Sequence, residues 1–274
     1  MKAYHQGQLD FFCGIYALIN ALRLTSGIGL ADARRILAEA LGAVSAYPLL
    51  WRATLDNSTD FYWLMRYLLG RYSRERGLAF RIARLPMTSL KSAERLRLRE
   101  KVGAQAAGSR RPQFAMGGSC GLSDAELRAW LNLSPPPLLE LADLRPQDLR
   151  FRQPDNGVPT PRECGWTLSE LWPLLEDWLP IKTLFSGFSQ GEGSGRCLIL
   201  RFHRHLYADQ PPVISHWTCG QEFNRDTLQL FDCTADKSAV HSLPFKQCAL
   251  RESELSKDRL LRLEPDSIYF LERM

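Results

Sequence analysis

The spacing of the apolar side chains changes along this chain from a helical pattern to a strand-like one. Apolar residues recur every three or four positions over residues 13–24, 30–42 and 61–76. This spacing predicts three amphipathic helices. From Cys197 onward the spacing is closer to two, over residues 197–203, 213–219, 227–231 and 267–271. These segments are candidate antiparallel strands, so a helical first half precedes a strand-rich second half.

Glycines and capping residues predict where the helices begin and end. We expect the first helix to stop at Gly27, the second at Gly42 and the third at Gly77. A further amphipathic helix over 166–179 contains a proline. A helix tolerates proline near its first turn, which is where it falls if Ser169 is the N-cap.

The segments between these elements predict how the chain is organised. Residues 78–85 alternate apolar and basic side chains in part, which predicts a short edge strand. Residues 135–165 begin with three prolines and predict a linker within one domain, between a helical lobe at about 1–134 and a sheet lobe at about 166–274. The glycine-rich residues 103–118 predict a mobile insertion or lid.

The composition is that of a globular protein, with 45% hydrophobic and 24% charged residues. The longest apolar run, residues 11–22, is shorter than the roughly 18 residues of a membrane span and is interrupted by Asn20. The first residues also lack the cleavage site of a secretory signal. We therefore expect no membrane association and a cytoplasmic, reducing location.

Seven cysteines are scattered along the chain without any C-x-x-C pair. An odd, unpaired set argues against a disulfide framework and against a structural zinc site. The glycine-rich loop at 186–195 has neither a lysine nor a following helix, so it does not predict a phosphate cradle. We expect no cofactor and no metal.

Positive charge is concentrated between Arg66 and Arg111, where 13 basic residues face 3 acidic ones, an excess of 10. Such a segment is either a solvated helix surface or a basic face for an acidic partner. We do not expect a nucleic-acid partner, because aromatic side chains do not alternate with these arginines in the way that base stacking requires.

Cys13 stands at the entrance of the first predicted helix, which makes it a candidate nucleophile. The partial positive charge and N–H groups of a helix N-terminus stabilise a thiolate. The amide of Gln8 could join the Cys13 N–H in holding an oxyanion. Cys120 is a weaker competitor that also precedes a helical pattern. The alternative for Cys13 is a buried core residue, since free cysteine is among the most buried residue types.

A nucleophilic cysteine needs a base, and the base needs an orienting partner. His216 lies in a predicted strand, and Asp232 ends the next one after a turn at Phe223–Asp226. In a hairpin the two side chains lie on neighbouring strands, which supports a hydrogen bond that fixes the imidazole tautomer. His203 and His205 have no evident acidic partner in the sequence.

These residues resemble the papain-like cysteine peptidase superfamily, and its bacteriocin-processing, peptidase C39-like branch in particular. The resemblance rests on Cys13-Gly-x-Tyr-Ala-x-x-Asn-Ala at a helix start, Ser-His216-Trp on a strand, and Leu-Phe-Asp232 on the next strand. It implies an α+β fold with a helical N-terminal lobe, an antiparallel sheet lobe and the active site between them. It also implies Cys13 as nucleophile, His216 as general base then acid, Asp232 as orienter and Gln8 as oxyanion donor. In the family the glutamine commonly stands six residues before the cysteine; this chain has glutamines at 6 and 8 instead, so Gln6 remains a rival.

Three functions fit these residues. The first is a cysteine peptidase or isopeptidase, a thiol hydrolase acting on a peptide or protein through a thioester acyl-enzyme. The second uses the same site as an acyltransferase, deamidase or transglutaminase-like enzyme, because one fold hosts several chemistries. The third is a non-catalytic module that binds an acidic partner through the face between Arg66 and Arg111.

Overall fold

A computed structural model describes residues 12–46, 48, 51, 61–85, 165–179, 195–232 and 240–274. The helices are α1 (Cys13–Ser26), α2 (Leu30–Ser45), α4 (Phe61–Arg76) and α8 (Leu168–Trp178). The strands are β1 (Phe80–Arg84), β2 (Arg196–Arg204), β3 (Ile214–Asn224), β4 (Thr227–Phe231), β5 (Ser242–Pro244), β6 (Cys248–Ala249) and β7 (Leu261–Arg273). Two short 3-10 helices, Phe245–Gln247 and Glu252–Glu254, flank β6. Helices and an antiparallel sheet confirm the α+β class.

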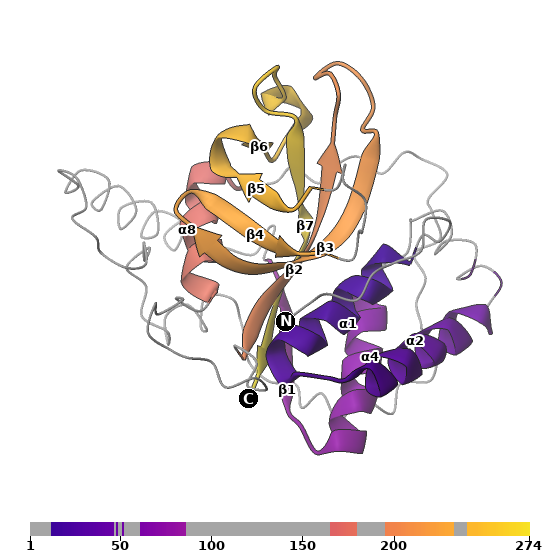
Figure 1. Ribbon diagram of the computed structural model, residues 1–274. Coiled ribbons are helices and arrows are strands. Elements are labelled where there is room, and N and C mark those ends of the chain that lie inside the picture. The colour runs from indigo at the N-terminus through magenta and orange to yellow at the C-terminus, as the bar shows by residue number, and fades with distance from the viewer. Residues whose placement is uncertain are drawn as a thin grey trace.

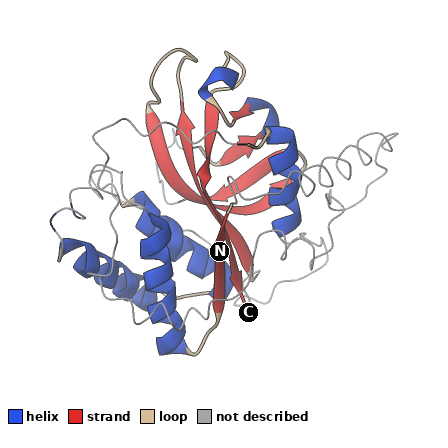
Figure 2. Ribbon diagram, turned by 180° about the vertical axis from the view of Figure 1, so that it is seen from behind, coloured by secondary structure: helices blue, strands red, loops and turns tan. Residues whose placement is uncertain are grey.

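One open sheet with the strand order β1-β7-β2-β3-β4-β5 forms the centre of the molecule. Neighbouring strands along this order are antiparallel, and β6 adds a short parallel pairing to β7. Figure 1 shows α1, α2 and α4 against one face of the sheet and α8 against the other. The view from behind in Figure 2 shows the same two layers.

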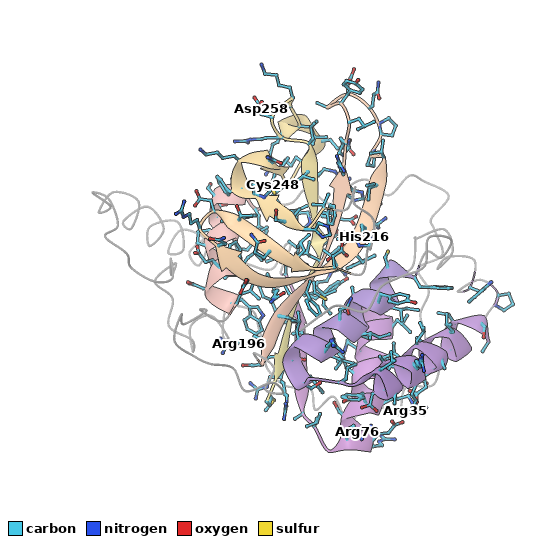
Figure 3. The ribbon with its side chains drawn as sticks, viewed as in Figure 1. Arg35, Arg76, Arg196, His216, Cys248 and Asp258 are labelled. Carbon is cyan, nitrogen blue, oxygen red and sulfur yellow. The ribbon has the colours of Figure 1, made fainter. Side chains whose placement is uncertain are left out.

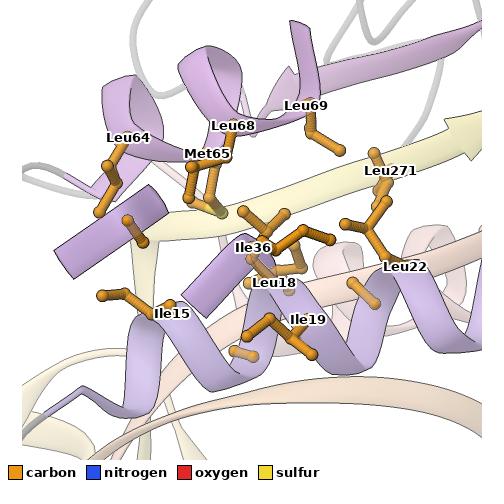
Figure 4. Close-up of a cluster of buried hydrophobic side chains, with 14 of the residues drawn as sticks. Ile15, Leu18, Ile19, Leu22, Ile36, Leu64, Met65, Leu68, Leu69 and Leu271 are labelled. Atoms are coloured by element: carbon orange, nitrogen blue, oxygen red, sulfur yellow. The ribbon is translucent and has the colours of Figure 1, made fainter. Parts of the chain in front are cut away.

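Each face of the sheet has its own hydrophobic core. The α1-side face carries Trp217, Cys219 and Tyr269, which pack with the apolar stripes of the three helices. Figure 4 shows the centre of this core, with Leu18 and Leu22 of α1 among the labelled side chains. The α8-side face is covered by the apolar side of α8 and carries the following residues: Leu198, Leu200, Phe202, Leu228 and Phe270.

Two of the three predicted helix ends, those at Gly27 and Gly77, are confirmed. Gly27 and Gly77 follow α1 and α4 with φ values of 67° and 63°, in the left-handed region that favours glycine. The expected stop at Gly42 is wrong, because α2 continues to Ser45. Val44 is fully buried, so tertiary packing extends the helix past a residue of poor helix propensity.

The N-cap of α8 also differs from the expectation. Thr167, not Ser169, precedes the first helical residue. Its backbone N–H and its hydroxyl both donate to Glu170 Oε2 at 2.9 Å. Pro173 is therefore the sixth residue of the helix and lies in its interior rather than near its first turn.

All four predicted strands of the second half are present, and the structure lengthens three of them. β2 covers Arg196–Arg204 instead of 197–203, β3 runs on to Asn224, and β7 covers Leu261–Arg273 instead of 267–271. β1 pairs with β7 as the predicted edge strand, so the helical half of the chain contributes to the sheet. The predicted linker and the 103–118 insertion lie outside the described residues.

Candidate functional site

His216 and Asp232 form a short hydrogen bond between β3 and the end of β4. His216 Nε2 lies 2.7 Å from Asp232 Oδ1. The Asp232 side chain is only 2% exposed and the His216 side chain 12%, so the contact is shielded while the imidazole edge remains close to the surface. The contact expected from the hairpin is therefore confirmed. Because Asp232 contacts Nε2, Nδ1 is the ring nitrogen that Asp232 does not engage.

The ring of His216 is also held from its other side. Phe202 of β2 is the direct strand partner of His216. The two rings meet edge to face, with centroids 5.9 Å apart and planes at 78°. Phe202 is 1% exposed and belongs to the α8-side core, so a rigid aromatic surface backs the imidazole.

Cys13 is the first residue of α1, as expected from the sequence. Its N-cap, Phe12, has no side-chain oxygen, and the first turn contains no acidic residue. The helix N-terminus therefore retains the positive end of its dipole at Cys13, without a neutralising carboxylate in that turn. Cys13 is 4% exposed and contacts the α1-side core.

Two sulfur contacts define how α1 crosses the sheet. Cys219 Sγ of β3 donates to Ala17 O at 2.8 Å, and Cys197 Sγ of β2 lies 4.0 Å from Ala21 O. Moving from Ala21 back to Ala17 thus carries the helix from β2 to β3. Another turn of about 5.4 Å in this direction carries Cys13 beyond β3, toward the side where β4 ends. Figure 3 shows His216 where the N-terminal end of α1 approaches the sheet.

The other described cysteines are structural. Cys197, Cys219 and Cys248 are fully buried and free of disulfides. Burial raises the pKa of Cys248 to about 12 and raises the pKa of Cys197 still further. These thiols stay protonated near neutral pH. Cys120, the competitor to Cys13, lies outside the described residues.

His203 belongs to a second polar cluster, which includes Ser215, the residue before His216. The sequence did not predict this cluster. His203 Nδ1 lies 2.7 Å from the hydroxyl of Ser215, its direct strand partner. His203 Nε2 lies 3.5 Å from Glu264 Oε2, and Arg201 Nη1 lies 3.4 Å from the same oxygen. The expectation that His203 has no acidic partner is therefore wrong. Glu264 stands 61 positions away, beyond any local pattern.

The surroundings of this cluster lower the pKa of both Glu264 and His203. Burial alone would raise the pKa of Glu264, but the neighbouring His203 and Arg201 outweigh it and lower the pKa to about 2. Burial lowers the pKa of His203. The other buried histidine, His205, bonds through Nδ1 to Gln210 O at 2.9 Å.

The described part of the basic segment is matched by acidic residues of the fold. Arg71 Nε lies 3.6 Å from Glu39 Oε2 of α2, and the guanidinium of Arg76 contacts the carboxylate of Asp32 on the same helix. Figure 3 shows Arg35 and Arg76 close together on the helical group. Within residues 66–85, part of the expected cationic face is thus internal charge pairing, and an acidic partner remains a prediction.

Several expectations fall on residues that the structure does not describe. Gln8 and its rival Gln6 are among them, as are residues 86–111 of the basic segment. No helix within the described ranges is long and apolar enough to cross a bilayer. Within those ranges, too, no group of three or more His, Cys, Asp or Glu side chains is arranged to hold a metal ion.

Comparisons of the chain with models of protein families, with curated proteins and with solved structures found no match.

Proposed function

We propose that this chain is a papain-like cysteine peptidase or isopeptidase that hydrolyses a peptide-like bond through a thioester. The observation that carries the proposal is the 2.7 Å contact between His216 Nε2 and Asp232 Oδ1. It supplies a base with a fixed orientation on β3, the strand against which the helix of Cys13 mainly packs. The pairing of His216 with Phe202 places its ring on the α8-side face, so the proposed reaction requires the Cys13 thiol to reach this ring past the first residues of β3. A buried aspartate on an imidazole also stabilises the imidazolium that forms when the base takes a proton.

The chemistry follows from these roles. His216, through Nδ1, takes the proton of the Cys13 thiol, and the thiolate attacks the carbonyl carbon of the substrate. The N–H groups at the start of α1, with the amide of Gln8 or Gln6, stabilise the developing oxyanion. The imidazolium then donates its proton to the leaving amine, and a thioester remains on Cys13.

Hydrolysis of the thioester repeats the steps with water. His216 removes a proton from a water molecule, which attacks the thioester carbonyl. Collapse of the second tetrahedral species releases the carboxylic acid, and the proton returns to the Cys13 sulfur. Asp232 holds the ring in one tautomer throughout, so each proton passes through the same nitrogen.

The test is alkylation of Cys13 at neutral pH by iodoacetamide, with peptide mapping to assign each modified cysteine. We expect Cys13 to react faster than a free cysteine, because a paired thiolate is the reactive form. His216→Ala should slow this reaction at least tenfold, and Asp232→Asn should slow it too. His241→Ala, which alters an exposed histidine, is the matched control and should leave the rate unchanged.

The same experiment contains its internal reference. Cys197 and Cys248 should remain unmodified in the folded protein, because burial raises their pKa values. A Cys13 that reacts no faster than free cysteine, and at a rate indifferent to His216→Ala, would mean that the thiol is a core residue and not a nucleophile.

A further inference from the structure

The register of the β3–β4 hairpin changes once between the turn and the His216–Asp232 pair. Next to the turn, Asn224 pairs with Thr227 and Glu222 with Gln229. Farther from the turn, Gly220 pairs with Leu230. Gln221 is therefore an extra residue on β3, and the strand is bulged between Gly220 and Glu222.

This bulge decides whether His216 and Asp232 lie on the same face of the sheet. Beyond the bulge, Cys219 pairs with Phe231, and both belong to the α1-side core. Side chains alternate along a strand, so Asp232 turns to the α8-side face, opposite Thr218 and two residues from His216. His216 is on this face too, since it pairs with Phe202 of the α8-side core.

Without the bulge, the same residues would point apart. The register at the turn, continued along β3, would pair Asp232 with Cys219. Asp232 and Cys219 would then share one face, and His216, three residues from Cys219, would lie on the opposite face. A register slip of one residue moves every side chain of a strand to the other face. The hydrogen bond between His216 and Asp232 thus depends on the extra residue being absorbed between Gly220 and Glu222.

Gly220 is the residue that leaves room for this arrangement. A Cβ placed on it would lie 3.1 Å from Leu228 Cδ1 and 3.2 Å from Leu198 Cβ. Leu198 is its direct partner on β2, and a Cβ atom moves only with its backbone. Any larger side chain must therefore shift β2 or β4 by a few tenths of an ångström. Glycine is needed here for space, and it marks the close approach of three strands.

We propose that Gly220 is a positioning residue for the candidate active site: the bulge that begins at it sets the register between β3 and β4 and brings the His216 ring and the Asp232 carboxylate onto one face. A role of Gly220 in catalysis rests on the proposed function, whereas the hydrogen bond between His216 and Asp232 that it positions is observed. Gly220 touches neither the substrate nor the reacting atoms and acts only through Asp232.

The test follows the His216 ring by NMR in the Cys13→Ala protein, so it needs no activity. Gly220→Ala should weaken the hydrogen bond to Asp232. We therefore expect the downfield imidazole N–H resonance to be lost and the titration midpoint of the His216 ring to fall by about one pH unit, because an opposite charge favours the imidazolium. In the protein with Cys13 intact, iodoacetamide labelling of Cys13 should slow at least tenfold.

Two control variants separate positioning from a general loss of structure. Gly42→Ala is the matched substitution, because a Cβ on Gly42 meets nothing within 4 Å, and it should leave the His216 titration unchanged. Leu228→Val removes the Cδ1 atom closest to the new methyl group. Combined with Gly220→Ala, it should restore part of the shift in the titration midpoint.

Deletion of Gln221 keeps the inference testable if Gly220→Ala fails to fold. It removes the extra residue while retaining the pairs of Gly220 with Leu230 and Glu222 with Gln229, so His216 should keep its hydrogen bond. An unchanged ring titration in a folded Gly220→Ala protein, or loss of the hydrogen bond in a folded deletion variant, would overturn the inference. If Cys13 reacts no faster than free cysteine but Gly220→Ala still shifts the His216 titration, only the proposed function is overturned.

Discussion

Replacing Glu264 by glutamine should make the protein markedly less sensitive to acid. The neighbouring His203 and Arg201 outweigh burial and lower the pKa of Glu264 from 4.5 to about 2. The Glu264 side chain is 26% exposed, so solvent screens the contacts only in part. A carboxyl whose pKa is lowered by folding contributes stability above its unfolded value, and this contribution is lost as the pH falls toward the folded value.

The magnitude follows from the two pKa values. The difference between these two pKa values corresponds to at most about 3 kcal/mol. At pH 3, between the two values, linkage predicts that about 2 kcal/mol has been lost relative to pH 6. The Glu264→Gln variant cannot show this loss, because glutamine does not titrate.

Urea unfolding at pH 6 and at pH 3 measures the effect. With a slope of about 2 kcal/mol per molar urea, the midpoint of the wild-type protein should fall about 1 M further than that of Glu264→Gln. Asp266→Asn is the matched control: burial and the charge of Glu264 raise the pKa of Asp266, so its removal should not reduce the acid sensitivity. An equal fall of the urea midpoint between pH 6 and pH 3 in the wild-type protein and in Glu264→Gln would refute the lowered pKa of Glu264.

Three further substitutions test the local structure by urea unfolding at neutral pH. Gly27→Ala should cost about 1 kcal/mol, because Gly27 has a φ of 67°, where a Cβ is strained; a neutral result would contradict the left-handed cap. Glu170→Ala should cost about 1–2 kcal/mol, since it removes the acceptor of two Thr167 hydrogen bonds, and full stability would show that the cap is dispensable. Arg76→Ala should cost less than about 1 kcal/mol, because its ion pair with Asp32 is exposed; a large loss would mean that the pair is coupled more strongly than its exposure suggests.

The candidate site was predictable where its residues are close in sequence or follow a simple period. Cys13 could be placed at a helix entrance because apolar residues recur at helical spacing after it and Gly27 ends the run. His216 and Asp232 could be placed on neighbouring strands because a short turn separates two strand-like segments. These signals are local, so they survive without knowledge of the rest of the fold.

The acidic partner of His203 could not be predicted for the opposite reason. Glu264 reaches His203 only because β7, from the end of the chain, pairs with β2. The end of α2 shows the same effect, since Gly42 reads as a stop and the buried Val44 beyond it keeps the chain helical. Contacts between distant segments override local preference in both places.

The sequence by itself determined the order of helices and strands, the helix entrance at Cys13 and the hairpin that joins His216 to Asp232, because periodicity, glycine stops and short turns are local properties. Only the tertiary structure decided that His216 and Asp232 lie on the same face of the sheet. Nothing in the spacing of residues 216–232 shows that β3 absorbs one residue at Gly220. That choice arises from packing among Leu198, Leu228 and the glycine between them, three residues from three different strands.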